Sequence, residues 1–286
     1  MNMLYWEKIY NAAANGRMEK KMDIKKFMSN ADEKPLDNLV SNGGFCADFR
    51  TIGCIGDSLS SGELESMELG ERGYHDYFEY SWGQFIARDA GCKVYNFSRG
   101  GMTAREYISG YAAAQGFLDP ALRCQAYIIA LGVNDVSQIL NKDLELGSIE
   151  DIHPTNYALN KPTFAGWYSA IISKYKTIEP NAKFFLMTMP KSTEDEERSA
   201  LYDQHAKLLY EIAEKFSNCY LLDFRKYAPK YDEEFRRRFF VGGHLNVSGY
   251  RLTALMVESY IDYIIRNNPD DFSQCGFIGK QHAYSE

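Results

Sequence analysis

Several features are missing from this sequence of 286 residues. None of its six cysteines forms a Cys-x-x-Cys pair, which argues against a zinc knuckle or a dithiol redox motif. No run of about 18 apolar residues is present, so we expect no membrane-spanning helix and no membrane partner. The net charge of −7 argues against a nucleic-acid partner, because phosphate binding requires a basic surface.

The sequence also lacks the marks of export. The first 23 residues contain neither a long apolar core nor a small-residue cleavage site, so we expect no signal peptide. Free cysteine packs like a small hydrophobic side chain, and four cysteines lie in or beside apolar runs: Cys54, Cys92, Cys124 and Cys219. Together these observations predict a cytoplasmic protein.

What the sequence does contain is a regular alternation of strand and helix patterns after residue 48. We expect strands at residues 50–56, 93–97, 126–131, 183–189 and 219–223. Helical patterns cover residues 80–90, 103–114, 163–177, 194–216 and 246–266, and Thr103 is a candidate N-cap. This order predicts a mostly parallel sheet with helices on both faces, a three-layer α/β/α fold. Functional groups of such sheets gather at the carboxyl ends of the strands.

The two ends of the chain form separate regions in this interpretation. Residues 1–45 are predicted to be a helical extension followed by a connector, residues 46–268 the main domain, and residues 269–286 a C-terminal tail. The N-terminal helices need a partner for their apolar faces. Packing against the main domain is the simpler interpretation, and formation of a homo-oligomer is the alternative.

Four short segments at predicted strand ends or before the last helix carry reactive or hydrogen-bonding groups. They are Gly56-Asp57-Ser58-Leu59, Asn96-Phe97-Ser98-Arg99-Gly100-Gly101, Gly132-Val133-Asn134-Asp135 and Val241-Gly242-Gly243-His244. Each segment taken alone also fits an ordinary structural role, such as a turn serine, a tight glycine turn, an Asx turn or an exposed histidine. Their shared place at one sheet edge favours a joint active site.

The four segments supply the parts of a serine hydrolase. Ser58 is a candidate nucleophile, and the imidazole of His244 can take its proton as a base. The N–H groups of Ser58 and Gly101 and the amide of Asn134 can hold an oxyanion. Asp57 and Asp135 are assigned supporting roles, Asp135 by hydrogen bonds that hold its loop. His75 falls in an aromatic stretch that could border the pocket. No metal site is predicted.

At these residues the sequence resembles the SGNH hydrolase superfamily, also called GDSL esterases and lipases. Its four blocks contribute Ser, Gly, Asn and His, which match Ser58, Gly101, Asn134 and His244 over about residues 50–266. The resemblance implies a flavodoxin-like fold and hydrolysis of carboxylic esters, with short acyl groups and in some members a carbohydrate alcohol. It also implies that no metal or organic cofactor is used. The expected partner is therefore a small-molecule or glycan ester.

One position departs from this pattern. The family usually has Asp-x-x-His, and here the aspartate position is occupied by Val241, which cannot orient the imidazole. Three explanations compete. A backbone carbonyl near Val241 or Gly242 orients His244 in a Ser-His dyad, which is the preferred interpretation. A carboxylate from elsewhere replaces the aspartate, with these candidates: Asp223, Asp232 and Glu63. Or the protein has lost hydrolysis and binds a carbohydrate or acyl ligand without turnover.

Overall fold

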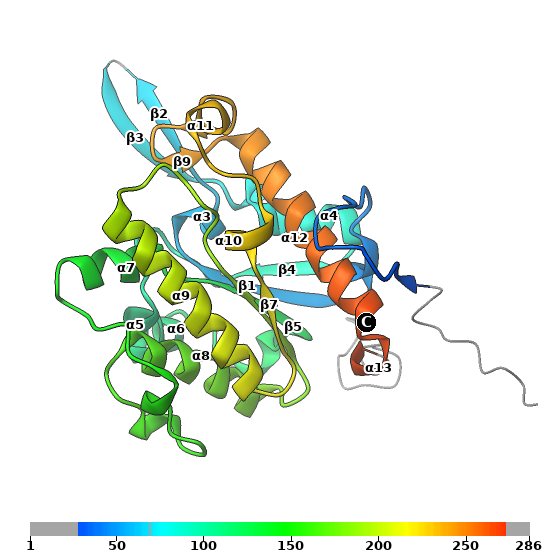
Figure 1. Ribbon diagram of the computed structural model, residues 1–286, viewed down its shortest axis with the longest axis vertical. Helices are drawn as coiled ribbons and strands as arrows, with labels where there is room; N and C mark the ends of the chain where they lie inside the picture. Colours follow the sequence, from blue (N-terminus) through cyan, green and yellow to red (C-terminus); the bar gives the residue numbers. More distant parts are fainter. Residues whose placement is uncertain (1–27, 69, 273–286) are drawn as a thin grey trace, which may run out of the picture.

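The computed structural model describes residues 28–68 and 70–272 (Figure 1). The helices predicted within residues 3–29 lie almost entirely outside this part, as does the predicted tail beyond residue 272. The described chain folds around one central sheet, with helices packed against both of its faces.

The central sheet confirms the predicted α/β class. Its five strands are β1 (Thr51–Gly56), β4 (Lys93–Asn96), β5 (Ala126–Ala130), β6 (Lys183–Met187) and β7 (Cys219–Leu222). They lie in the order β4-β1-β5-β6-β7, and every neighbouring pair is parallel. Counted along the sheet, this is the 2-1-3-4-5 order of flavodoxin-like folds, and its switch point lies where β1 separates β4 from β5.

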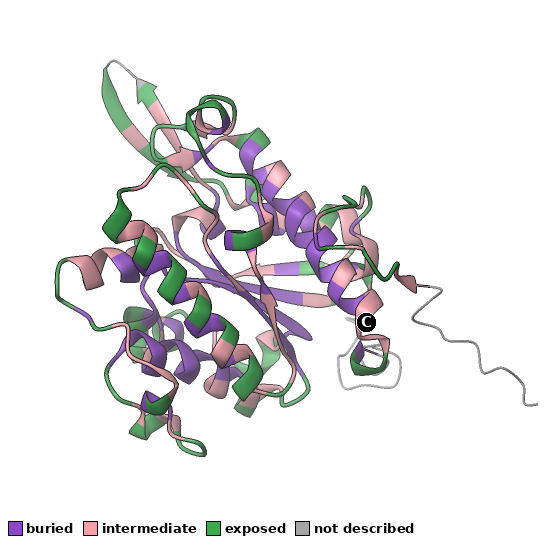
Figure 2. Ribbon diagram, in the orientation of Figure 1, coloured by how far each residue is buried: buried purple, intermediate pink, exposed green. Residues whose placement is uncertain are grey.

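Each face of the sheet buries its own apolar cluster. On β5, Ile128 packs toward α4 (Trp82–Ala90) and α12 (Val247–Asn267), whereas Ile129 packs toward the opposite cluster. That second cluster is covered by α5 (Ala104–Glu106), α8 (Phe164–Ile178) and α9 (Glu196–Lys215). Alternate side chains of a strand point to opposite faces, so a strand covered on both sides needs a continuous apolar sequence. Figure 2 shows the resulting buried layer through the middle of the molecule.

The remaining elements are short and connect this framework. The helical ones are η1 (Gly44–Asp48), α3 (Ser58–Ser61), η2 (Phe78–Tyr80), η3 (Tyr107–Tyr111, a π-helix), α6 (Ala112–Ala114), η4 (Pro120–Leu122), α7 (Val133–Leu140), η5 (Ile149–Asp151), η6 (Tyr157–Leu159), α10 (Phe224–Tyr227), α11 (Glu233–Phe239) and α13 (Pro269–Phe272). The predicted cap at Thr103 is present, because its side chain accepts a hydrogen bond from Glu106 N at the start of α5.

A β-hairpin follows the first strand and helix, in a stretch that the sequence left without assigned structure. Strands β2 (Glu63–Glu68) and β3 (Glu71–Asp76) pair antiparallel, so that Glu65 lies opposite Tyr74. A second, minimal hairpin is formed by β8 (Phe240–Val241) and β9 (His244–Leu245). The β2–β3 hairpin projects from the carboxyl edge of the sheet beside β9 and α11 (Figure 1). This arrangement places two acidic strand residues close to the loop that carries His244.

The segment before β1 packs on helix α12. Arg266 of this helix pairs with Glu33 at 2.6 Å and with Asp262 at 2.7 Å. A backbone group of the same segment also contacts α12, since Val40 N donates a hydrogen bond to Ser259 Oγ at 2.9 Å. Within the described ranges, no helix is both long enough and apolar enough to cross a membrane.

Candidate functional site

Ser58 stands at the turn between strand β1 and helix α3. The preceding residue, Asp57, caps the helix by accepting a hydrogen bond from Leu59 N at 3.0 Å. Gly56 is required by the tight turn, since a Cβ atom there would lie 2.1 Å from Ser60 Oγ. Burial raises the pKa of Asp57 to about 6, despite the opposing hydrogen bond from the backbone N–H of Leu59. The strand, the cap and the short helix together hold the Ser58 hydroxyl at the edge of the sheet.

His244 contacts this hydroxyl from the far end of the chain. Its Nε2 lies 2.9 Å from Ser58 Oγ, although 186 residues separate the two positions. The imidazole projects from β9, and its side chain is 17% exposed. The ring also meets Tyr74 edge-to-face, with 5.8 Å between centroids. A hydroxyl within hydrogen-bond reach of a neutral imidazole has the geometry of a nucleophile and its base.

The other nitrogen of His244 is held by a carboxylate from the β2–β3 hairpin. Glu65 Oε1 lies 2.7 Å from His244 Nδ1 and accepts a second hydrogen bond from Gly243 N, also at 2.7 Å. Arg72 on the facing strand approaches Glu65 Oε2 at 3.4 Å. Burial alone would raise the pKa of Glu65, but the hydrogen bonds and the nearby Arg72 outweigh it and lower the pKa. Glu65 is therefore ionised at neutral pH.

The glycine pair before His244 makes this contact possible. A Cβ atom at Gly242 would lie 1.9 Å from Glu65 Oε2, and one at Gly243 would lie 3.0 Å from Glu65 Oε1. Gly242 also adopts a left-handed φ of 61°, which favours glycine. The loop thus wraps around the Glu65 carboxylate with no side chain between them.

The preferred interpretation of Val241, in which a backbone carbonyl orients His244, is wrong, because Glu65 holds this position. Val241 pairs with His244 across the β8–β9 hairpin, and its side chain is exposed. A carboxylate, and no backbone carbonyl, meets Nδ1 of the imidazole. Two of the proposed replacements have other roles, because Asp223 caps α10 and Asp232 caps α11. Glu65 itself is not among the carboxylates that the sequence motifs suggested.

Glu63, the third proposed replacement, does reach His244 but at the other nitrogen. Its Oε1 lies 3.0 Å from His244 Nε2, the atom that also meets Ser58. Residues two apart on a strand share a face, so Glu63 and Glu65 both turn toward His244 and flank its ring. Two glutamates spaced two residues apart could have indicated this pair of carboxylates from the sequence. That inference would have required knowing that residues 63–68 form a strand.

The predicted oxyanion donors belong to segments that lie next to the Ser58 turn. Gly101 has a left-handed φ of 71° and no atom within 4 Å of a hypothetical Cβ, so its surface is open. A Cβ at the preceding Gly100 would lie 3.9 Å from Ser58 Cβ. In the described part of the chain, neither Ser58 N–H nor Gly101 N–H has a protein acceptor. Two backbone donors next to the hydroxyl are thus available to a ligand.

Asn134 completes this group from the first turn of α7. Its amide donates to Met102 O at 3.1 Å and lies 3.5 Å from Asp57 Oδ2, which places it beside the Ser58 turn. The next residue, Asp135, accepts a hydrogen bond from Ala104 N at 2.9 Å and so ties two strand-end loops together. Burial raises the pKa of Asp135 to about 7. The structure therefore brings Ser58, Gly101, Asn134 and His244 to one place, as the sequence predicts.

The other described histidines are not part of this group. His75 lies on β3 but points to the opposite face from Tyr74, where it contacts Ser66 Oγ at 2.9 Å. His153 accepts local backbone hydrogen bonds. His205 is buried against Phe164, and burial lowers its pKa to about 4. Within residues 28–68 and 70–272, no cluster of three or more His, Cys, Asp or Glu side chains could hold a metal ion.

Solved structures with the same fold support this description of the architecture. A protein from Lactobacillus plantarum matches at 17% identity with a TM-score of 0.55, covering 75% of this chain and 97% of the other. A family 2 carbohydrate esterase of Corynascus thermopiles matches at 15% identity and a TM-score of 0.51, covering 76% and 66%. A family two carbohydrate esterase from Clostridium thermocellum, solved with cellohexaose, matches at 17% and 0.50, covering 78% and 65%.

The sequence itself also matches a known family. No curated protein shows significant similarity to it. The family model described as GDSL-like lipase/acylhydrolase matches residues 54–252, which is more than two thirds of the chain and spans all four strand-end segments. From this match, and from the flavodoxin-like sheet with its serine and histidine at one edge, the chain belongs to the GDSL-like lipase/acylhydrolase family.

Proposed function

We propose that this protein is a serine esterase that hydrolyses carboxylic esters through an acyl-enzyme, with a Ser58-His244-Glu65 triad. The observation that carries the proposal is the chain of two hydrogen bonds, 2.9 Å from Ser58 Oγ to His244 Nε2 and 2.7 Å from His244 Nδ1 to Glu65 Oε1. Membership of an acylhydrolase family supports the same reaction class.

The first half of the reaction forms the acyl-enzyme. Ser58 Oγ attacks the acyl carbonyl carbon while its proton passes to His244 Nε2. The negative charge of the tetrahedral intermediate develops on the former carbonyl oxygen. When the intermediate collapses, the bond to the alcohol oxygen breaks, and Nε2–H returns the proton to that oxygen. The buried Glu65 carboxylate stabilises the transient imidazolium and keeps Nδ1 protonated, so that Nε2 faces the hydroxyl.

The second half restores the enzyme. Water donates a proton to His244 Nε2 and attacks the acyl carbon, and the ester bond to Ser58 then breaks as Oγ recovers the proton. In both halves the oxyanion is held by Ser58 N–H, Gly101 N–H and the Asn134 amide. For the amide this requires a turn away from Asp57, where its present contact of 3.5 Å is weak.

We further propose that the acyl group is short and that carbohydrate esters are among the substrates. The fold similarity to two family 2 carbohydrate esterases, one of them solved with cellohexaose, supports this choice. The rival idea, a protein that binds but does not hydrolyse, depended on the missing aspartate at position 241. Because Glu65 now meets His244 Nδ1, that argument no longer favours it.

Ester turnover by the purified protein tests the proposal. We expect hydrolysis of p-nitrophenyl acetate, covalent labelling of Ser58 by a fluorophosphonate probe, and a steep fall in rate as the acyl chain lengthens. The Ser58→Ala variant serves as the baseline and should not be labelled. Turnover by the natural sequence no faster than that of Ser58→Ala, with no labelling, would refute an activated nucleophile.

We also propose a cytoplasmic location. The five described cysteines are free thiols, and three of them are buried, which suits a reducing compartment: Cys46, Cys54, Cys92, Cys124 and Cys219. Fractionation of the source cells with an antibody against the protein tests this. Recovery of the protein outside the cytoplasmic fraction would contradict it.

A further inference from the structure

The mechanism above leaves one carboxylate of the site unused. Glu63 Oε1 lies 3.0 Å from His244 Nε2, and Ser58 Oγ lies 2.9 Å from the same nitrogen. Glu63 therefore stands on the side of the imidazole where protons are exchanged, opposite to Glu65. Its side chain is 14% exposed, so one part of it remains open to a ligand.

Glu63 is held in this position by two features of the fold. The hydroxyl of Tyr250 donates to Glu63 O at 2.6 Å and also approaches Ser58 O at 3.4 Å, so helix α12 fixes both backbones together. On the other side, a Cβ atom at Gly100 would lie 2.5 Å from Glu63 Oε2. The missing side chain at Gly100 thus provides the space that this carboxylate oxygen occupies.

The carboxylates of the two glutamates differ in the hydrogen-bond donors and positive charges around them. Glu65 receives hydrogen bonds from His244 Nδ1 and Gly243 N and has Arg72 nearby. In the part of the chain that the structure describes, Glu63 has His244 Nε2 as its single side-chain partner. With the imidazole proton held on Nδ1 by Glu65, Nε2 has no proton to donate to Glu63 in the state that attacks the ester. A half-buried carboxylate with no donor is unfavourable, so a donor from the substrate would stabilise it.

We propose that Glu63 binds the alcohol half of the ester by accepting a hydrogen bond from a free hydroxyl on the carbon next to the ester-bearing carbon. This inference rests on the proposed esterase function and specifies its substrates as monoesters of vicinal diols, including partly acylated polyols and sugars. The ester oxygen must lie within hydrogen-bond reach of His244 Nε2 to receive its proton. A hydroxyl on the neighbouring carbon lies about one hydrogen-bond length from that ester oxygen. Glu63 Oε1, which lies 3.0 Å from the same nitrogen, is therefore near enough to accept its hydrogen bond.

The same carboxylate selects against other alcohols. An alcohol with a negative charge near the ester would be repelled by Glu63, and a purely apolar one would leave the carboxylate without a donor. A site built to bind a hydroxyl rejects analogues that lack it far more strongly than an apolar pocket rejects an added group. We therefore expect discrimination in favour of hydroxylated alcohols.

Two acetates of nearly equal size test this inference, namely 2-hydroxyethyl acetate and propyl acetate, in which a methyl group replaces the hydroxyl. We expect kcat/KM of the natural sequence to favour 2-hydroxyethyl acetate by about 10- to 100-fold, the range for a hydrogen bond to a charged group. In Glu63→Ala this ratio should fall to about one. Glu63→Gln, which keeps the side-chain volume, should show an intermediate ratio and carries the test if Glu63→Ala fails to fold.

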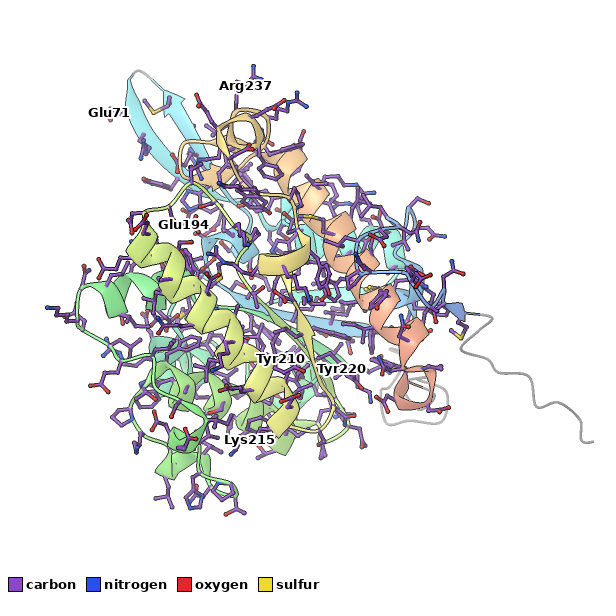
Figure 3. The ribbon with its side chains drawn as sticks, viewed as in Figure 1. Glu71, Glu194, Tyr210, Lys215, Tyr220 and Arg237 are labelled. Atoms are coloured by element: carbon purple, nitrogen blue, oxygen red, sulfur yellow. The ribbon has the colours of Figure 1, made fainter. Side chains whose placement is uncertain are left out.

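Glu71→Gln is the matched control, since Glu71 is exposed on β3 of the same hairpin (Figure 3). It should leave the substrate ratio unchanged. An equal loss on both acetates in the Glu63 variants would overturn the inference, because Glu63 would then act on His244 and not on the alcohol. A ratio near one in the natural sequence would overturn it as well. If neither acetate is hydrolysed and Ser58 resists fluorophosphonate labelling, the esterase proposal itself fails and this inference with it.

Discussion

Two regions of the molecule build the site by different means. Ser58, Gly101 and Asn134 come from loops at the carboxyl edge of the parallel sheet, where the topology brings strand ends together. The two glutamates come from a hairpin that lies outside that sheet and that touches the sheet edge through His244. The comparison teaches that the carboxylate that meets the imidazole need not accompany the histidine in sequence, provided that another element can deliver one to the same nitrogen.

Glu65 and the buried carboxyl groups of the sheet-edge loops differ in the direction of their pKa shifts. Burial raises the pKa of Asp57 to about 6 and that of Asp135 to about 7, and both accept hydrogen bonds from backbone N–H groups. The pKa of Glu65 is lowered, because donors and Arg72 outweigh its burial. A carboxyl group that stabilises a developing imidazolium has to remain ionised, and the lowered pKa of Glu65 favours its charged form.

Removing the hairpin carboxylate should have the largest effect. We expect Glu65→Ala to lower kcat for p-nitrophenyl acetate by about 10⁴-fold, the loss seen when a triad aspartate is replaced. The far-ultraviolet circular dichroism should not change. Glu71→Ala, the variant of an exposed glutamate on the same hairpin, is the control. If Glu65→Ala retains more than a tenth of the activity of this control, the claim that the hairpin supplies the carboxylate for His244 is contradicted.

Blocking the approach of the carboxylate should have the next largest effect. A methyl group in Gly242→Ala would overlap Glu65 Oε2 and push the carboxylate away from His244, so we expect kcat to fall by about 10²- to 10³-fold. Gly70→Ala is the matched control, because Gly70 has a φ of 83° but no atom near a hypothetical Cβ. It carries the same backbone strain without the overlap. Equal kcat values for the two variants would argue against the contact.

A change on the sheet-edge side should act on the oxyanion and not on the base. Removing one oxyanion donor typically lowers kcat by about 10²- to 10³-fold, so we expect a loss in this range for Asn134→Ala, with KM changed little. Steady-state kinetics on p-nitrophenyl acetate measures both parameters. A loss seen mainly in KM would mean that Asn134 holds the ground state of the substrate, and the assignment to the oxyanion would be wrong.

The smallest expected effect concerns stability and pH at Asp135. Its folded-state pKa of about 7 lies above the value of 3.8 for a free side chain, so the folded state binds the proton more tightly. Stability linked to this group is therefore fully present below pH 4 and is lost as the pH rises toward 7. Asp135→Asn lacks this loss, so its melting temperature relative to the natural sequence should rise between pH 5 and pH 8. A constant difference across this range would contradict the raised pKa.

Most of the framework could be predicted from the sequence, because its signals are local. Ala126–Ala130 reads as a buried strand from its continuous apolar run, and Thr103 reads as a cap from its place before a helix. The positions of Ser58, Gly101 and Asn134 follow from the rule that parallel strands end at one edge, and His244 was expected near them because its segment precedes the last helix.

The carboxylate partner could not be predicted in the same way. Residues 63–76 are rich in charge and lack the alternation of apolar and polar residues that marks a half-buried strand. The hairpin is exposed over much of its surface, and the strand register that turns Glu63 and Glu65 toward His244 depends on tertiary contacts with β9. Gly242 and Gly243 precede the histidine, but nothing in the sequence named the carboxylate that their backbone approaches.

The hydrogen bond between Glu65 and His244 can be observed directly. We predict a proton resonance far downfield of the backbone amides in the one-dimensional NMR spectrum, arising from His244 Nδ1–H bound to Glu65 Oε1 at 2.7 Å. The resonance should be present in the natural sequence and in Glu71→Gln, and it should disappear in Glu65→Ala. Its persistence in Glu65→Ala would show that another group orients His244, and the account of the hairpin as the source of the orienting carboxylate would be wrong.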